Sequence, residues 1–156
     1  MIYLAADHRG FALKEALKRH LAARGSDVVD VGNNVPDPDD DYGDFAARVA
    51  EKVSEKPTED RGRLICGSGH GMDIAANKFR GVRATLCWNA EVAKQSREHE
   101  DANVLVLARD WVSEDDAAAI VDAWLDTPFS GEERHLRRLG KIAKIEEKRW
   151  ITTHEL

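Results

Sequence analysis

The chain has 156 residues and a formal net charge of −6, from 23 basic and 29 acidic side chains. Hydrophobic residues make up 42% of it, which is typical of a globular protein that buries a core and excludes a disordered chain. The acidic balance argues against binding to a nucleic-acid backbone, although a small phosphorylated ligand needs only a few local cations.

Features of membrane and secreted proteins are not visible in the sequence. No apolar run approaches the roughly 18 residues of a membrane span, and residues 1–6 lead into Asp7 and His8 without a recognisable signal segment. The two cysteines, Cys66 and Cys87, form neither a CxxC pair nor a disulfide framework. We therefore expect a reduced, cytoplasmic protein that does not bind a membrane.

Short apolar runs alternate with amphipathic segments along the chain. The apolar runs predict strands over residues 2–6, 27–31, 63–66, 82–88 and 104–107. The other segments predict helices over residues 11–24, 42–56, 74–79, 90–98 and 113–125. The acidic loop at 32–41 is expected to be solvated. No hairpin signal occurs, so the alternation predicts a three-layer α/β/α, Rossmann-like fold with a five-stranded parallel sheet.

A long charged helix is expected over about residues 131–150, at the end of the chain. It is long for the edge of a monomer and could pack on another subunit. Composition shifts, repeats and linkers are absent from the sequence, so we expect residues 1–156 to form one domain.

Polar segments follow three of the predicted strands, at residues 7–10, at residues 66–71, and in the segment that leads to His99. Ligands of open parallel sheets bind beyond the carboxyl ends of the strands. We therefore expect these three groups to converge on one edge of the sheet.

Glycines alternate at Gly67, Gly69 and Gly71, between the third predicted strand and a helix. Such a turn lets backbone N–H groups approach an anionic oxygen, and the dipole of the helix favours the negative charge. The spacing is neither that of a dinucleotide-binding turn nor that of a P-loop. A structural turn without a ligand is the alternative.

Cys66 directly precedes this turn. A cysteine at the end of a strand is more often a small buried hydrophobe than a catalyst. The glycine turn and the helix N-terminus can both stabilise a thiolate, however, and a thiolate could act as a base or a nucleophile. Cys87 lies in a predicted strand without such a turn, so we interpret it as part of the core.

Histidines and arginines supply the other candidates. His8 follows Asp7 in what could be a simple polar turn, and His99 lies in a charged stretch that is typical of a surface. The histidines and carboxylates lack the spacing of metal ligands, so we expect no metal. Arg134 and Arg138 share one face of the last helix, where they are either solvated or placed to bind a phosphate.

Together, these segments resemble the ribose-5-phosphate isomerase B family, which also includes galactose-6-phosphate and allose-6-phosphate isomerases. The matching segments are residues 6–10, 41–42, 64–72, 74–78, 81–84, 96–99, 103, 120–125 and 134–138. The resemblance implies a cofactor-free aldose–ketose isomerase of a sugar phosphate, with ribose 5-phosphate and ribulose 5-phosphate as the leading pair, in the pentose phosphate pathway. It also implies a homodimer or tetramer whose active sites are shared between subunits.

The resemblance further implies a role for each site residue. Cys66 matches the base that moves a proton between C1 and C2 through a cis-enediol, Ser68 matches a residue that holds the proton on the substrate oxygens, and His99 matches the acid that opens the furanose ring. Met72 stands where another branch of the family has its catalytic Glu. The implied substrate-binding residues are Asp7, His8, Tyr42, Gly67, Gly69, His70, Gly71, Glu100, Arg109, Arg134 and Arg138.

Two positions depart from the family pattern. Glu100 stands where the family usually has Asn, and Asp110 stands where it usually has an Arg that reaches a phosphate. A carboxylate at position 110 repels a phosphate, so either Arg109 replaces that cation or the site has changed. Another aldose phosphate of four to six carbons is therefore an alternative substrate, and a non-catalytic sugar-phosphate-binding module is the alternative function.

Overall fold

The computed structural model describes the backbone of residues 1–154 and the side chains of residues 1–149. Five parallel strands pair in the order β2-β1-β3-β5-β4. They are β1 (Ile2–Ala6), β2 (Val28–Asp30), β3 (Arg61–Cys66), β4 (Ala84–Leu86) and β5 (Val104–Ala108). The helices are α1 (Phe11–Ala23), α2 (Tyr42–Glu55), α3 (His70–Ala76), α4 (Ala90–Glu100), α5 (Glu114–Asp126) and α6 (Glu133–His154). The predicted fold class is confirmed.

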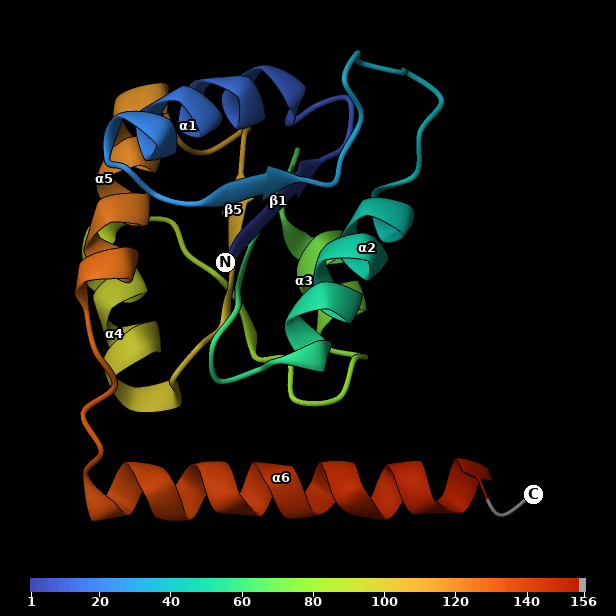
Figure 1. The fold of residues 1–156 in the computed structure, drawn as a ribbon, viewed down its shortest axis with the longest axis vertical. Coiled ribbons are helices and arrows are strands. Elements are labelled where there is room, and N and C mark those ends of the chain that lie inside the picture. Colours follow the sequence, from blue (N-terminus) through green and yellow to red (C-terminus); the bar gives the residue numbers. More distant parts are fainter. Residues whose placement is uncertain (155–156) are drawn as a thin grey trace.

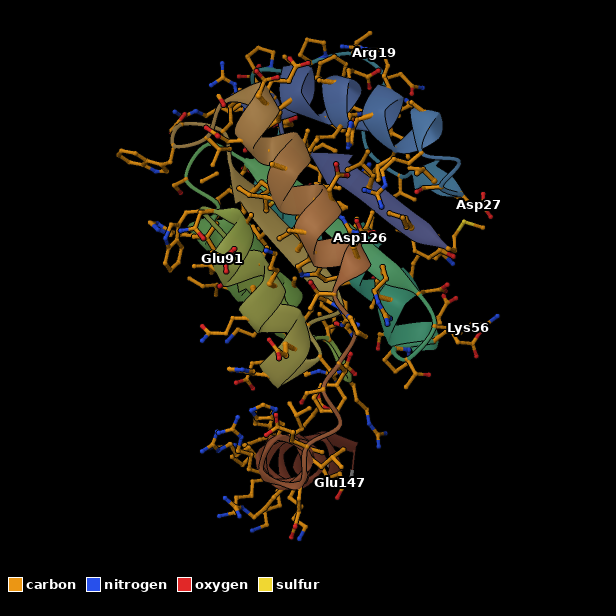
Figure 2. All side chains as sticks on the ribbon, turned by 90° about the vertical axis from the view of Figure 1, so that its left-hand side faces the viewer. Arg19, Asp27, Lys56, Glu91, Asp126 and Glu147 are labelled. Atoms are coloured by element: carbon orange, nitrogen blue, oxygen red, sulfur yellow. The ribbon has the colours of Figure 1, made fainter. Side chains whose placement is uncertain are left out.

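Helices cover both faces of the sheet (Figure 1). Successive strand residues point to opposite faces, so Ile65 packs with α1, α4 and α5, whereas Leu64 and Cys66 pack with α2 and α3. In Figure 2, α5 and α4 lie in front of the sheet, α1 lies above and α6 is seen end-on below. Among the described helices, none is long and apolar enough to cross a membrane.

Helix α6 lies apart from these layers, along the lower edge of Figure 1. It passes beneath the amino ends of the strands, where the Gly81 N–H donates to Glu146 Oε1 at 2.8 Å. A hollow of about 650 Å³ separates its middle from the β4 region, and Ile142 and Ile145 on this helix are exposed. The helix thus leaves apolar side chains uncovered.

Several predicted boundaries were wrong. Helix α3 begins at His70 rather than 74, because Gly69 has a left-handed φ of 80° and the helix follows it at once. Strand β4 ends at Leu86, so Cys87 lies just beyond it, although the cysteine is buried as expected. Helix α6 starts at Glu133 and extends past residue 150.

Strand β3 begins at Arg61, two residues before the prediction, because Arg61 and Gly62 do not continue the apolar run. The strand also carries a buried arginine, Arg63. The Arg63 side chain is 1% exposed, and its guanidinium lies 4.1 Å from the Trp124 ring centroid. Burial, together with the charges of Arg61 and Arg97, lowers the pKa of Arg63 to about 9. Its Nη1 donates to the Gly62 carbonyl, but Nε and Nη2 are buried without a partner.

Candidate active site

Cys66 is the last residue of β3, and its side chain is buried at the carboxyl edge of the sheet. Its Sγ accepts a hydrogen bond from the Gly69 N–H at 3.1 Å. Gly69 holds a backbone conformation that favours glycine, and an added Cβ would collide with Leu86. The turn therefore aims an amide at the sulfur, as the glycine spacing predicted.

The charge state of Cys66 differs from the sequence expectation. Burial raises the pKa of the Cys66 thiol, against the lowering effect of the Gly69 amide. The nearby Asp7 carboxyl raises this pKa further, while the Met72 amide and the Arg9 charge lower it. Burial therefore favours the thiol form, because desolvation outweighs the turn's stabilisation of a thiolate.

The turn between β1 and α1 brings Asp7 and His8 to the same edge. The buried Asp7 carboxylate accepts a hydrogen bond from the Gly10 N–H at 2.9 Å, and burial raises its pKa. His8 Nδ1 lies 2.7 Å from Asp40 Oδ1, and this hydrogen bond raises the pKa of His8. Asp40 belongs to the loop expected to be solvated, but its side chain is only 7% exposed. This partner of His8 was missed.

Two side chains lie directly on glycines of the turn. An added Cβ at Gly71 would collide with the Tyr42 ring, and one at Gly67 would lie 2.6 Å from Arg9 Cζ. Only glycine permits these close approaches. Ser68, between the two glycines, is half-buried, and His70 is exposed at the start of α3.

Arg9 is the arginine on the glycine turn. Its Nη2 donates to Asp110 Oδ2 at 2.6 Å, and the Asp110 N–H donates to the Gly67 carbonyl at 3.0 Å. Arg109 is bound to the same turn only through its backbone, since its N–H donates to the Cys66 carbonyl at 2.8 Å. Its exposed side chain lines a small hollow with residues of α1 and the start of α5.

The expected convergence with His99 does not occur within one chain. His99 is in the last turn of α4, just ahead of β5, whose Val104 pairs with Gly62. Cys66 pairs with Ala108, four residues farther along, which is about 13 Å of strand. Helix α4 also packs on the face of the sheet opposite Cys66. Like any helix between parallel strands, it runs back to the amino edge before β5 begins.

His99 packs against the start of α6. Its ring centroid lies 4.4 Å from that of His135, whose side chain is buried. His135 Nδ1 lies 2.7 Å from the Ser130 hydroxyl, while its Nε2 is buried without a partner. This histidine pair was not predicted.

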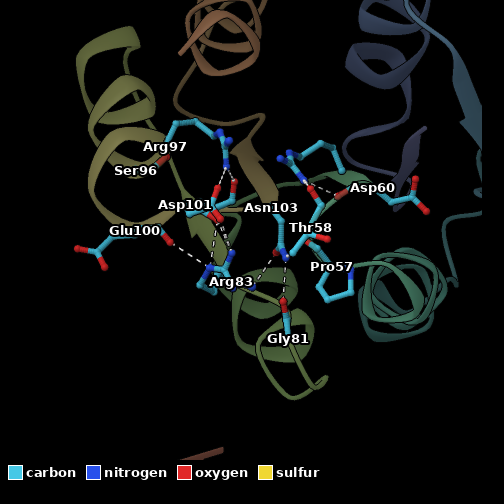
Figure 3. Close-up of polar contacts among 12 residues, drawn as sticks. Pro57, Thr58, Asp60, Gly81, Arg83, Ser96, Arg97, Glu100, Asp101 and Asn103 are labelled. Atoms are coloured by element: carbon cyan, nitrogen blue, oxygen red, sulfur yellow. Dashed lines mark hydrogen bonds and ion pairs between the residues drawn. The ribbon is translucent and has the colours of Figure 1, made fainter. Parts of the chain in front are cut away.

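A polar network fixes the end of α4 (Figure 3). Asp101, which has a positive φ of 45°, accepts hydrogen bonds from Arg83 at 2.9 Å and Arg97 at 2.8 Å. The Asn103 amide donates to the carbonyls of Pro57 and Gly81 at 3.0 and 2.8 Å. The network anchors the helix that carries His99.

The remaining predicted residues are also at the amino edge. Arg134 and Arg138 are exposed on α6, and Arg134 Nε lies 2.8 Å from Glu132 Oε2. Glu100 is exposed, and its carbonyl accepts a hydrogen bond from Arg83 Nε at 3.0 Å. Within the described residues, no three His, Cys, Asp or Glu side chains gather as a metal site.

Comparison with known proteins shows which family this chain resembles. Residues 2–142 match the Ribose/Galactose Isomerase family. The probable ribose-5-phosphate isomerase B of Mycoplasma genitalium is 43% identical over 145 residues, covering 93% of this chain and 95% of the relative. The Escherichia coli ribose-5-phosphate isomerase B is 42% identical over 148 residues, covering 95% and 97%.

Solved structures agree. The Mycoplasma genitalium ribose-5-phosphate isomerase B with bound ribulose-5-phosphate superposes with a TM-score of 0.91 at 43% identity, covering 94% of this chain and 95% of that one. The Clostridium thermocellum ribose-5-phosphate isomerase B gives 0.89 at 45% identity, covering 94% and 97%. The chain belongs to the ribose/galactose isomerase family.

Proposed function

We propose that this protein interconverts ribose 5-phosphate and ribulose 5-phosphate as a sugar phosphate isomerase of one domain. The Cys66 thiol with the Gly69 amide aimed at its sulfur is the observation that carries the proposal. Family membership supports it, as does the ribulose-5-phosphate bound to the Mycoplasma genitalium relative.

The proposed chemistry is a proton transfer that needs no cofactor. The Cys66 thiolate takes the proton from C2 of the open-chain aldose while O1 gains a proton, which forms a cis-enediol. Return of the carbon proton from Cys66 to C1, with loss of the O2 proton, gives the ketose and restores the thiolate. Negative charge grows on the substrate oxygens during the first step, so fixed donors near them lower the barrier. The amides of the turn at 67–71 and the Ser68 hydroxyl are the donors at this edge.

We assign ring opening to His99, and phosphate binding to Arg134 and Arg138. These residues lie at the opposite edge of the sheet from Cys66, so one chain cannot complete the site. We therefore propose that a second copy of the chain supplies them, in a homodimer or a tetramer. The uncovered apolar residues of α6 support this assembly, which would operate in the cytoplasm in the pentose phosphate pathway.

The test is turnover of aldose phosphates of four, five and six carbons by the purified protein, beside calorimetric binding of each. We expect ribose 5-phosphate to have the highest kcat/KM. Highest turnover with a four- or six-carbon substrate would reassign the substrate. Binding without turnover of any of them would identify a sugar-phosphate-binding module.

A further inference from the structure

We propose that Arg9, oriented by Asp110, binds the phosphate of the substrate at the Cys66 site. The proposal rests on the sugar phosphate function given above and adds a ligand residue to it. His8 and Arg9 are consecutive, and each is held by a carboxylate from a distant loop, Asp40 or Asp110. These contacts fix a histidine and an arginine side chain at the edge that carries the glycine turn.

The position of Arg9 is set from two sides. Its Nη2 is bound to Asp110, and the guanidinium lies against Gly67, the neighbour of Cys66. Asp110 is fixed in turn by its own N–H, which donates to the Gly67 carbonyl. The guanidinium is thus held in place before a ligand binds, which lowers the entropy lost on binding.

Arg9 keeps binding capacity in this orientation. A guanidinium has five N–H donors, and the contact with Asp110 uses one. The Arg9 side chain is 55% exposed, so its other donors reach a ligand that lies over the turn. The phosphate is the permanent anion of a sugar phosphate, and the planar guanidinium matches its oxygens.

The pair also explains how a carboxylate is tolerated at this edge. Alone, Asp110 would repel a phosphate dianion, but the contact with Arg9 neutralises it. Among the described residues Arg109 forms no ion pair with Asp110; it lines the hollow beside α1 and α5. A role for Arg109 in phosphate binding stays a prediction of the sequence.

The first test is inhibition and calorimetric binding by inorganic phosphate, with KM for ribose 5-phosphate measured beside them. Arg9→Ala should weaken phosphate binding and raise KM by about tenfold to a hundredfold, as expected for a charge-assisted hydrogen bond. Arg19→Ala is the matched control, because Arg19 is an exposed arginine on α1 away from the site (Figure 2). It should change neither quantity.

The second test separates orientation from repulsion through Asp110→Asn. In the wild-type background this change should weaken phosphate binding, because Arg9 loses its partner. In the Arg9→Ala background it should strengthen phosphate binding, because the bare carboxylate then only repels. Stronger binding in both backgrounds would show that Asp110 does not orient Arg9 and would overturn that part of the proposal.

Unchanged phosphate binding in Arg9→Ala overturns the proposal, whether or not KM changes. This outcome is distinct from failure of the proposed function. If wild-type protein binds phosphate but converts no sugar phosphate, the isomerase assignment fails, while calorimetry with inorganic phosphate still decides the role of Arg9. Unchanged thermal unfolding of each variant verifies that the fold is intact.

Discussion

The two edges of the sheet differ in how they are built. At the carboxyl edge, close contacts on glycines and ion pairs between distant loops surround the Cys66 thiol. At the amino edge, buried arginines and a histidine pair lock α4 against α5 and the start of α6. The first arrangement leaves donors open to a ligand, whereas the second holds the half-buried His99 against the start of α6. Residues of one proposed reaction are thus divided between two edges.

The largest expected effect is at the carboxyl edge. Cys66→Ala should lower kcat by at least ~10²–10⁴, the usual range for a lost acid or base, and leave phosphate binding intact. The thiol contacts backbone amides of the turn and of α3, those of Gly69 and Met72, and no polar side chain forms a hydrogen bond with it among the described residues, so the loss to the fold is small. Cys87→Ala is the control, because Cys87 is equally buried but lies outside the turn. Full activity of Cys66→Ala would exclude the thiolate mechanism.

Replacement of His99, at the amino edge, should slow the two directions of the reaction unequally. His99→Asn should slow conversion of ribose 5-phosphate, which is mostly a closed ring, far more than conversion of the open-chain ribulose 5-phosphate in the reverse direction. The difference should approach the ~10²–10⁴ of general acid catalysis. An equal loss in both directions would mean that His99 does not act in ring opening.

The pH dependence of kcat/KM should reflect the ionisation of the Cys66 thiol at the carboxyl edge. Burial raises the pKa of the Cys66 thiol, and the base is the thiolate, so the active form gains population as pH rises through that raised value. We expect kcat/KM, which depends on the free enzyme, still to increase above pH ~8.5, the ordinary value for a thiol. A profile that is flat across this range would contradict a buried thiol as the base.

The smallest effect is expected from changes at Arg63, which is buried in β3 against Trp124 of α5. Arg63→Met should keep the packing on Trp124 and remove a buried charge with two unpartnered N–H groups, so stability should stay within about 1 kcal/mol of wild type or rise. Arg63→Ala loses that packing as well and should cost about 2–4 kcal/mol. Denaturant unfolding measures both. Equal large losses would show that the charge itself holds this region together.

Most helices and strands could be predicted because the spacing of apolar residues along the sequence reflects which side chains are buried in the core. The start of β3 was missed because Arg61 and Gly62 do not continue the apolar run. The pairs of His8 with Asp40 and of Arg9 with Asp110 span 32 and 101 residues, and nothing local indicates them. The position of His99 could have been predicted, since a helix between parallel strands returns to the amino edge before the next strand begins.

The division of the site between two copies is tested most directly by mixing two inactive variants. Cys66→Ala and His99→Asn chains are denatured, combined in equal amounts and refolded. A shared site should restore roughly a quarter of wild-type activity, because about half of the dimers are mixed and each contains one intact site of two. Cys66→Ala mixed with Ser68→Ala is the control, because both changes lie at the carboxyl edge and no intact site can form. Activity no higher than that of the parent variants in the first mixture would contradict a site shared between subunits.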